Sequence, residues 1–500
     1  MDLRIVPAAL TAWAATAAGI AWGVGPAIAA LCVAFGTGWA LAARQLGDRH
    51  PVLRAAGIGV VSTALIGCAF ALAAGLRSEA VRHHPLTHRF GATAWVVVIP
   101  AEGPRVVGSG RLMFRGDLRS AGDSGVDGAV TVFATGPDFG RVTPGRPIRF
   151  RARLAKPTRR DLSIAVLTAV GKPEFGAAPA VQRAAQGLRD GFASACRAVL
   201  PAEQAAMLPG LVLGDTSAVP AATASEFRIA GLTHLTAVSG ANVSIVCGTV
   251  LLTARFLGPR PAVGLAAVAL VAFVVVVQPG ASVLRAAVMG AIGLIGVLSS
   301  RRRQAIPALS GTVISLMLFS PQLAVDVGFA LSVSATAALV VLAPVWSKRL
   351  VGRGWPKPVA DGLCVALAAQ WATAPLIAAI SGQLSLVSVI ANLLVAMVIP
   401  PITLFGTAAV VLAPIWPAAA GLLIRFTGPE LWWLLHAAHM VAEVPGAAVT
   451  VPDGWAGFGT IGGAGACCVL LWRWRWFRRA SAGAVLVALA WSVSALVGAP

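Results

Sequence analysis

The sequence predicts a polytopic α-helical membrane protein with about 10-13 spanning or re-entrant helices and an inserted small β-barrel domain. Hydrophobic residues make up 57% of the 500 residues, charged residues 12%, and the mean hydropathy is +0.82. These values lie far from those of soluble domains. Apolar segments near the roughly 20 residues that cross a bilayer recur along the chain. Only the region from about residue 80 to 172 is polar and rich in turn residues.

The first 79 residues are predicted to form three transmembrane helices. Apolar segments cover residues 5–23, 25–43 and 55–76. The link RQLGDRHPVLR between the second and third carries three arginines. Basic links face the cytoplasm by the positive-inside rule, so the third helix delivers the next domain to the outer side of the membrane.

Residues 80–172 are expected to form an extracytoplasmic β domain. Short runs with alternating or β-branched residues, separated by turn signals such as TGPDFG and TPGRP, predict five strands. Five short strands in this length suit a small barrel such as an OB-fold. The predicted strands are residues 92–99, 106–114, 129–135, 147–154 and 162–169.

The fourth of these strands, PIRFRARL, places Arg149, Arg151 and Arg153 on one face. Such a row suits a track for a polyanion, and residues 77–172 hold sixteen Lys or Arg against seven Asp or Glu. A solvated strand face near an anionic membrane is the other interpretation. Stacking partners for bases are few, namely Trp95, Phe114, Phe133, Phe139 and Phe150. DNA binding by this domain is therefore a hypothesis.

Residues 173–230 are expected to form an interfacial helix followed by a re-entrant linker. The stretch from Ala180 to Leu200 mixes apolar and charged positions, which is typical of a helix on a membrane surface. The apolar run that ends at Gly214-Asp215 is too short to cross a bilayer, so a re-entrant or surface segment is predicted there.

Residues 231–500 are predicted to form a transmembrane domain. Basic links such as SSRRRQ and WSKRLVGRGWPKP fit one orientation if residues 383–418 count as a single broken crossing. The break is expected at Ile399-Pro400-Pro401-Ile402, since broken helices are tolerated where they line a cavity. The apolar segments are 235–256, 261–278, 281–299, 304–320, 323–345, 358–380, 383–418, 421–441, 457–472 and 481–499.

Charged residues within these segments are candidate functional residues, because burying them in a bilayer is costly. Arg285 and Asp326 lie at similar depths near the outer ends of their helices. We predict that they pair with each other, although snorkelling of Arg285 to the interface is the alternative. Asp215, Glu226, Arg228 and His234 lie at the outer mouth of the segment that begins at residue 235.

Other polar groups are uncharged or widely spaced. Ser239, Asn242, Gln370 and Asn392 are interpreted as interhelical hydrogen-bonding groups, or as the lining of a path if they converge. His436, His439 and Glu443 have a spacing that resembles metal ligands, but HExxH is absent and packing at the membrane interface is favoured. The seven cysteines form no CxxC or Cys/His cluster. No metal or cofactor is expected.

Four ordered motifs resemble those of the ComEC-type competence protein family. GLVLGDTSAVPAATASEFRIAGLTHLTAVSGANVSIV is similar to the family's GD segment and its F-R-x-x-G-L-x-H-L-x-A-x-S-G run. QPGASVLRAAVMG, SPQLAVDVGFALSVSATAAL and QWATAPLIAAISGQLSLVSVIANLLV resemble three later elements. The positions carried over are Asp215, Glu226, Arg228, His234, Ser239, Gly240, Arg285 and Asp326.

This resemblance implies a channel that passes single-stranded DNA through the cell membrane in natural transformation, with the β domain receiving the strand. Asn242 stands where the family often has a second histidine. The metallo-β-lactamase-like domain of many members is not matched in this chain, and neither its ligand cluster nor a GxxxxGK[ST] loop occurs in the sequence. We therefore expect a channel and not an enzyme, with a DNA receptor, a separate nuclease and a cytoplasmic ATPase as partners. The alternatives are a transporter or flippase for another anionic substrate, such as a lipid or cell-wall precursor, and a non-transporting remnant.

Overall fold

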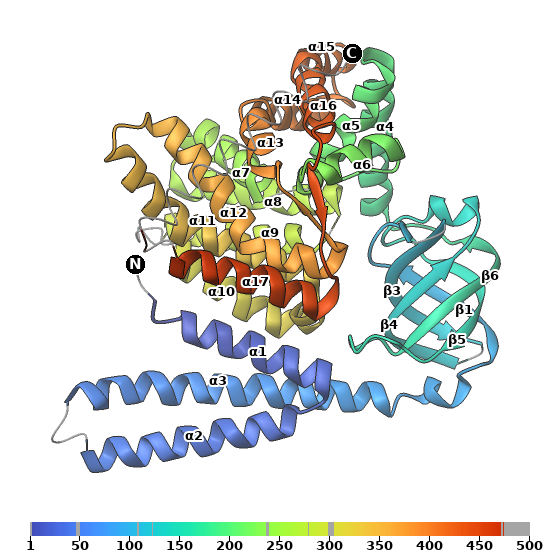
Figure 1. The fold of residues 1–500 in the computed structure, drawn as a ribbon. Coiled ribbons are helices and arrows are strands. Elements are labelled where there is room, and N and C mark those ends of the chain that lie inside the picture. The colour runs from blue at the N-terminus through green and yellow to red at the C-terminus, as the bar shows by residue number, and fades with distance from the viewer. Residues whose placement is uncertain are drawn as a thin grey trace. The chain divides into compact units, whose positions relative to one another are not determined.

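The computed structural model describes residues 3–46, 51–107, 110–122, 124–236, 240–278, 280–298, 305–471 and 474. The chain divides into two compact units. Unit 1 takes the described residues of Met1–Gly187 and Val250–Ala330, and unit 2 takes those of Leu188–Thr249 and Leu331–Pro500. Figure 1 shows a β domain within a chain that is otherwise helical.

Unit 1 begins with three helices that pack on one another, as the apolar segments predict. They are α1 (Val6–Trp22), α2 (Gly25–Leu46) and α3 (Pro51–Arg82). Small residues allow close approach, because a Cβ added at Gly25 would lie 2.5 Å from the carbonyl oxygen of Ala71. α3 continues beyond its predicted end, and its last turns carry the Arg82–Glu79 pair.

The β domain contains six strands, five of which close into a barrel. The closed order is β1-β3-β4-β6-β5 and back to β1, and the β4–β6 pair is parallel while the others are antiparallel. β2 adds to the free edge of β3. The strands are β1 (Thr93–Pro100), β2 (Arg105–Val107), β3 (Arg111–Ala121), β4 (Ser124–Ala134), β5 (Ile148–Ala155) and β6 (Ala165–Phe175), with 3₁₀ turns η1 (Pro85–Arg89) and η2 (Pro137–Arg141).

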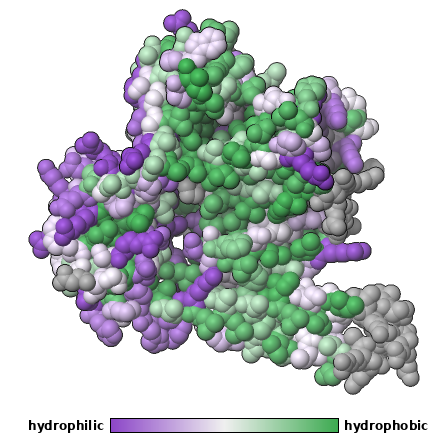
Figure 2. All heavy atoms as spheres, turned by 180° about the vertical axis from the view of Figure 1, so that it is seen from behind, coloured by the Kyte–Doolittle hydropathy of each residue, from purple (hydrophilic) through white to green (hydrophobic). Residues whose placement is uncertain are grey.

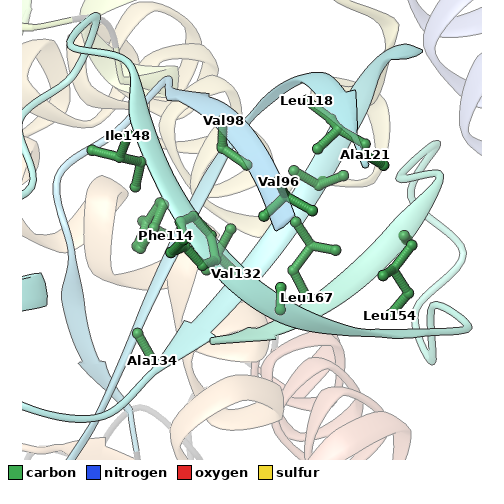
Figure 3. Packing of buried hydrophobic residues seen from close by; sticks show 14 of the residues in the cluster. Val96, Val98, Phe114, Leu118, Ala121, Val132, Ala134, Ile148, Leu154 and Leu167 are labelled. Atoms are coloured by element: carbon green, nitrogen blue, oxygen red, sulfur yellow. The ribbon is translucent and has the colours of Figure 1, made fainter. Parts of the chain in front are cut away.

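The barrel core confirms the alternation read from the sequence. Figure 3 shows side chains of the barrel strands pointing inward, among them Val96, Phe114 and Leu167. Three of the five aromatic residues considered as stacking partners, Phe114, Phe139 and Phe150, are buried in this core and are unavailable to bases.

Three strand predictions are wrong in their bounds, and the last of them, 162–169, is instead β6 over Ala165–Phe175. The run 106–114 was expected to be one strand, but β2 ends at Val107 and β3 begins at Arg111. The third strand was expected over residues 129–135, yet Ser124 and the residues that follow already pair in β4. Its glycine at 128 allows close packing there, since an added Cβ would lie 2.6 Å from Ile164 Cδ1.

The remainder of unit 1 consists of η4 (Ala254–Leu257), α8 (Pro259–Val277), α9 (Ala281–Leu298), α10 (Ala305–Phe319) and η5 (Pro321–Val325). α9 packs on α8 and α10, and α1 packs on α10 and η5. The indole of Trp13 in α1 donates to the carbonyl oxygen of Ala324 at 3.0 Å.

Unit 2 contains most of α4 (Ala180–Val199), followed by α5 (Ala202–Leu213), α6 (Ala221–Ile229), η3 (Thr233–Leu235) and most of α7 (Gly240–Thr253). α4 is helical as predicted, but Phe192 and Cys196 on its apolar side are fully buried in protein. The short apolar run expected as a re-entrant or surface segment forms the C-terminal part of α5, where every residue from Met207 to Leu213 is buried.

The segment 235–256 was predicted to span as one helix, and this prediction is wrong. α7 begins only at Gly240, after the separate 3₁₀ turn η3. The hydroxyl of Thr236 donates to the carbonyl oxygen of Thr233 at 2.9 Å, which offers the backbone an alternative to helical bonding.

The later elements of unit 2 follow α11 (Val327–Val351), whose first turn lies in unit 1. They are α12 (Lys357–Ser381), β7 (Gln383–Ser385), α13 (Ser388–Val395), α14 (Ile399–Leu412), α15 (Pro417–Phe426), α16 (Gly428–Ala442), β8 (Ala448–Thr450) and α17 (Gly454–Leu471). β7 and β8 pair in an antiparallel ribbon. The predicted segment 481–499 lies outside the described residues.

Breaks in two predicted segments have different outcomes. α13 and α14 are bent by 56°, which confirms the predicted break, and the pair has the length and composition of a broken span or a re-entrant loop. The break precedes Pro400 and Pro401, since proline fits the first turn of α14. The segment 421–441 is instead divided between α15 and α16 at Thr427, ahead of Pro429.

Five helices, α2, α3, α8, α11 and α12, are long and apolar enough to cross a membrane, and the bent pair of α13 and α14 would make six. These assignments rest on length and composition and cover only the part of the chain that the structure describes. On the face shown in Figure 2, hydrophilic residues gather over the β domain, and hydrophobic residues cover much of the helical surface.

Candidate functional site

The segment GLVLGD forms the C-terminal end of α5. Gly214 adopts a left-handed conformation with φ of 71°. Its N–H donates to the carbonyl oxygen of Gly210 at 3.0 Å, and the N–H of Asp215 donates to that of Pro209 at 3.2 Å. The bond from the Gly214 N–H to the carbonyl oxygen of Gly210 is the αL motif, which ends a helix and favours glycine at the left-handed position.

Two buried side chains donate hydrogen bonds to backbone carbonyl groups in the last turn of α5, where the regular helical bonding ends. Arg189 Nη1 of α4 donates to the carbonyl oxygen of Leu213 at 3.1 Å, and Asn242 Nδ2 of α7 donates to that of Leu211 at 3.2 Å. Arg189 Nη2 also lies 3.7 Å from Asp215 Oδ2. Burial lowers the pKa of Arg189, and the charge of Asp215 opposes this shift. The predicted residues Asp215 and Asn242 therefore help to hold α4, α5 and α7 together.

Gly231 lies against the broken helix pair. Its φ is +72°, and an added Cβ would lie 2.6 Å from both Cβ and Oγ of Ser388 and 3.3 Å from Cβ of Ser385. Gln370 Nε2 of α12 donates to the carbonyl oxygen of Ser385 at 3.1 Å, and Asn392 Nδ2 donates to that of Ser388 at 2.8 Å. Gln370 and Asn392 thus converge on the β7–α13 corner.

Arg228 and His234 are exposed. Although the His234 side chain reaches the surface, the protein around it removes solvent and lowers the pKa of the imidazole, while a backbone contact with Gly231 opposes the shift. Gly240 is the first residue of α7. Ser239 lies outside the described residues.

Glu226 of α6 pairs with His439 of α16. His439 Nδ1 lies 3.0 Å from Glu226 Oε1, and its Nε2 lies 3.2 Å from Glu443 Oε1. The hydrogen bond to Glu226 is the main cause that raises the pKa of His439, with added contributions from the charges of both carboxylates. His436 instead stacks on Trp432 with ring centroids 5.0 Å apart. Within the described residues, no group of three or more His, Cys, Asp or Glu has an arrangement that could hold a metal ion.

Arg285 and Asp326 belong to unit 1, and the predicted pair between them is wrong. Asp326 Oδ2 lies 3.3 Å from Nη1 of Arg115, a residue of β3. Its other oxygen, Oδ1, accepts from the N–H of Phe329 at 2.9 Å and so caps α11. Arg285 is buried, with Nη1 3.3 Å from Met289 Sδ.

The arginine row on β5 has the predicted arrangement. Arg149, Arg151 and Arg153 are exposed and alternate with buried residues. Trp95 on the neighbouring strand β1 is 41% exposed, and the Arg149 guanidinium lies 4.9 Å from its ring centroid. Arg149 Nη1 also lies 3.7 Å from Glu174 Oε2. The face therefore combines several cations with one accessible aromatic ring.

Sequence reasoning missed a second arginine row and one buried arginine. Arg111 and Arg115 lie at even spacing on β3, which places them on one side of the strand, and Arg119 follows at a register irregularity between Leu118 and Ser120. That spacing was visible in RLMFRGDLRS. The role of Arg189 had no signal in the sequence, because its partner carbonyl group belongs to a residue 24 positions away.

Comparisons with known proteins match the region that holds most of these residues. The model of the family described as Competence protein matches residues 211–476. ComE operon protein 3 of Bacillus subtilis (strain 168) is 27% identical over 209 residues, which are 41% of this chain and 26% of that protein. No solved structure matches. The family match covers more than half of the 500 residues, so the chain belongs to the competence protein family.

Proposed function

We propose that this protein is a membrane channel that carries single-stranded DNA across the cytoplasmic membrane during natural transformation. The observation that carries the proposal is the exposed face of β1 and β5, where the row of Arg149, Arg151 and Arg153 lies beside Trp95. Membership of the competence protein family supports DNA uptake as the process. We also propose that the chain transports the strand without cutting it.

The β domain is proposed to be an OB-like barrel that receives the strand outside the membrane. Its closed strand order and single parallel pair support this assignment, since OB-folds are five-stranded Greek-key barrels that bind oligonucleotides. Arginines two residues apart on a strand lie about 7 Å from each other, which suits contact with successive phosphates. Trp95 offers a ring on which a base can stack.

The helices are proposed to form the passage, with α2, α3, α8, α11 and α12 crossing the bilayer. The bent pair of α13 and α14 supports a cavity, because broken helices at membrane depth occur where backbone is buried or lines water. A DNA receptor, a separate nuclease and a cytoplasmic ATPase are the partners that such a channel requires.

Binding of labelled oligonucleotides to the purified full chain in detergent tests the substrate class. We expect tighter binding of a single strand than of a duplex, with affinity falling steeply as salt rises because counterions are released. Anionic phospholipid micelles serve as the competing ligand. Displacement of the strand by these micelles at equal phosphate, or equal binding of duplex and single strand, would favour a transporter of another anion.

A further inference from the structure

Arg115 is the residue of the β3 arginine row whose guanidinium group contacts a carboxylate from outside the β domain. Its Nη1 lies 3.3 Å from Asp326 Oδ2, and its side chain is 42% exposed. Arg119, four residues further along β3, pairs with Asp127 of β4 within the barrel at 2.9 Å. Asp326 differs from Asp127 because it belongs to the start of α11 and not to the β domain.

We propose that Arg115 is a phosphate-binding position of the barrel that Asp326 masks, so that a phosphodiester reaching Arg115 replaces the carboxylate and releases the barrel from α11. This inference rests on the proposed function, because it extends the anion-binding surface of the β domain. At Arg115, Asp326 Oδ2 takes the place of one phosphate oxygen.

The geometry favours exchange. The contact between the two groups is through one guanidinium nitrogen, whereas arginine binds phosphate best through two parallel N–H bonds. An ion pair with one partner this exposed contributes little net stability, so a second anion can replace it. A strand bound along the barrel also brings phosphates to Arg115 at high local concentration.

Asp326 keeps a structural partner after the exchange. Its Oδ1 still accepts from the Phe329 N–H, so α11 stays capped. Phe329 is fully buried and packs edge-to-face on Trp13 of α1, with ring centroids 5.4 Å apart. Loss of the Arg115 contact therefore changes the link to the barrel and leaves the packing of the helix start in place.

The test uses the purified full chain and a fluorescent single-stranded oligonucleotide at several salt concentrations. Asp326→Asn removes the charge but keeps an acceptor for the Phe329 N–H, and asparagine is a good N-cap. It is expected to tighten binding about two- to fivefold. Arg115→Gln is expected to weaken binding and reduce the salt slope by about one. In the Arg115→Gln background, Asp326→Asn should bring no gain.

Asp127→Asn is the matched control, since it removes a carboxylate from the neighbouring pair on the same barrel. Its effect should be the same with Arg115 or Gln at position 115. Masking is overturned if Asp326→Asn gives no gain, or if its gain persists in the Arg115→Gln background. Equal thermal unfolding of all variants shows that the differences are not caused by misfolding.

A second arm replaces the oligonucleotide with sodium polyphosphate. One outcome is that the chain does not bind the oligonucleotide, while Asp326→Asn tightens polyphosphate binding only when Arg115 is present. In that case the masked site stands and the proposed DNA function fails. If neither probe shows that gain, the masked site is wrong, and oligonucleotide binding by the wild-type chain still decides the proposed function.

Discussion

Asn242 of α7 donates its side-chain amide to the carbonyl oxygen of Leu211 in α5, at 3.2 Å. In a continuous helix the N–H of Asp215 would bind this oxygen, but it binds that of Pro209 instead. The turn at Gly214 thus leaves a buried acceptor, which Asn242 satisfies.

Replacing Asn242 with leucine should destabilise unit 2. The Leu211 carbonyl group would lose this partner in a buried setting, and a buried polar group without a partner costs about 1–3 kcal/mol. Thermal unfolding of the full chain in one detergent measures the change. Ser244→Ala is the control, because the exposed Ser244 hydroxyl bonds only one turn back, to the Gly240 carbonyl oxygen. Equal effects of the two substitutions would contradict the account.

Gly231→Ala should destabilise the contact with α13. An alanine would have a left-handed conformation, at a cost of about 1–2 kcal/mol, and its Cβ would overlap Ser388. Adding Ser388→Gly should restore the stability lost through overlap with Ser388. The loss caused by the left-handed conformation of the alanine should remain. Gly248→Ala in α7 is the control, since an added Cβ there meets no described atom within 4 Å. Protein yield and unfolding temperature give the readout, and an unchanged Gly231→Ala protein would refute this role.

The pair of His439 and Glu226 should make stability depend on pH. Because the folded pKa of His439 is raised, its contribution is fully present below the unfolded pKa of about 6.5 and is lost as pH rises through the folded value. The stability difference between the wild type and His439→Gln should therefore shrink as pH rises. Glu226→Gln should lower the pKa of His439, measured by its NMR titration. His436→Gln is the control, and an equal pH dependence in that variant would argue against the pair.

Single substitutions on the barrel should separate charge from stacking. Arg151→Gln is expected to reduce the salt slope of oligonucleotide binding by about one, because one phosphate contact is lost. Trp95→Ala should weaken binding by about 1–3 kcal/mol with little change in that slope. Fluorescence anisotropy at several salt concentrations measures both. Arg183→Gln, an exposed arginine on α4 that donates to Ala178, is the control.

Local pattern predicted much of this fold. The N-terminal helices, the barrel with its outward arginines and the bent pair near Pro400 follow from apolar length, period-two alternation and proline. The start of α7 was missed because hydroxyl-to-backbone bonds compete with helical bonding in an apolar run. The division of residues 421–441 into α15 and α16 was not predicted, although Pro429 fits the first turn of a new helix.

The candidate site was predicted less completely. Motif positions identified Asp215, Glu226 and Asp326, but their partners are Arg189, His439 and Arg115, which lie far away in sequence. Spacing along one helix cannot indicate such pairs. The expected pairing of Arg285 with Asp326 failed for this reason, since depth in a helix gives no information on the barrel residue nearby.

DNA uptake in competent cells is the decisive measurement of whether this protein carries DNA across the membrane. Cells that lack this protein are compared with cells that carry the wild type, Arg149→Gln/Arg151→Gln/Arg153→Gln or His234→Ala at equal protein levels, and labelled DNA inside the cytoplasm is measured. The proposed channel function requires that uptake is absent in the null strain and is strongly reduced by the triple substitution. Uptake in the null strain equal to that of the wild type would contradict it.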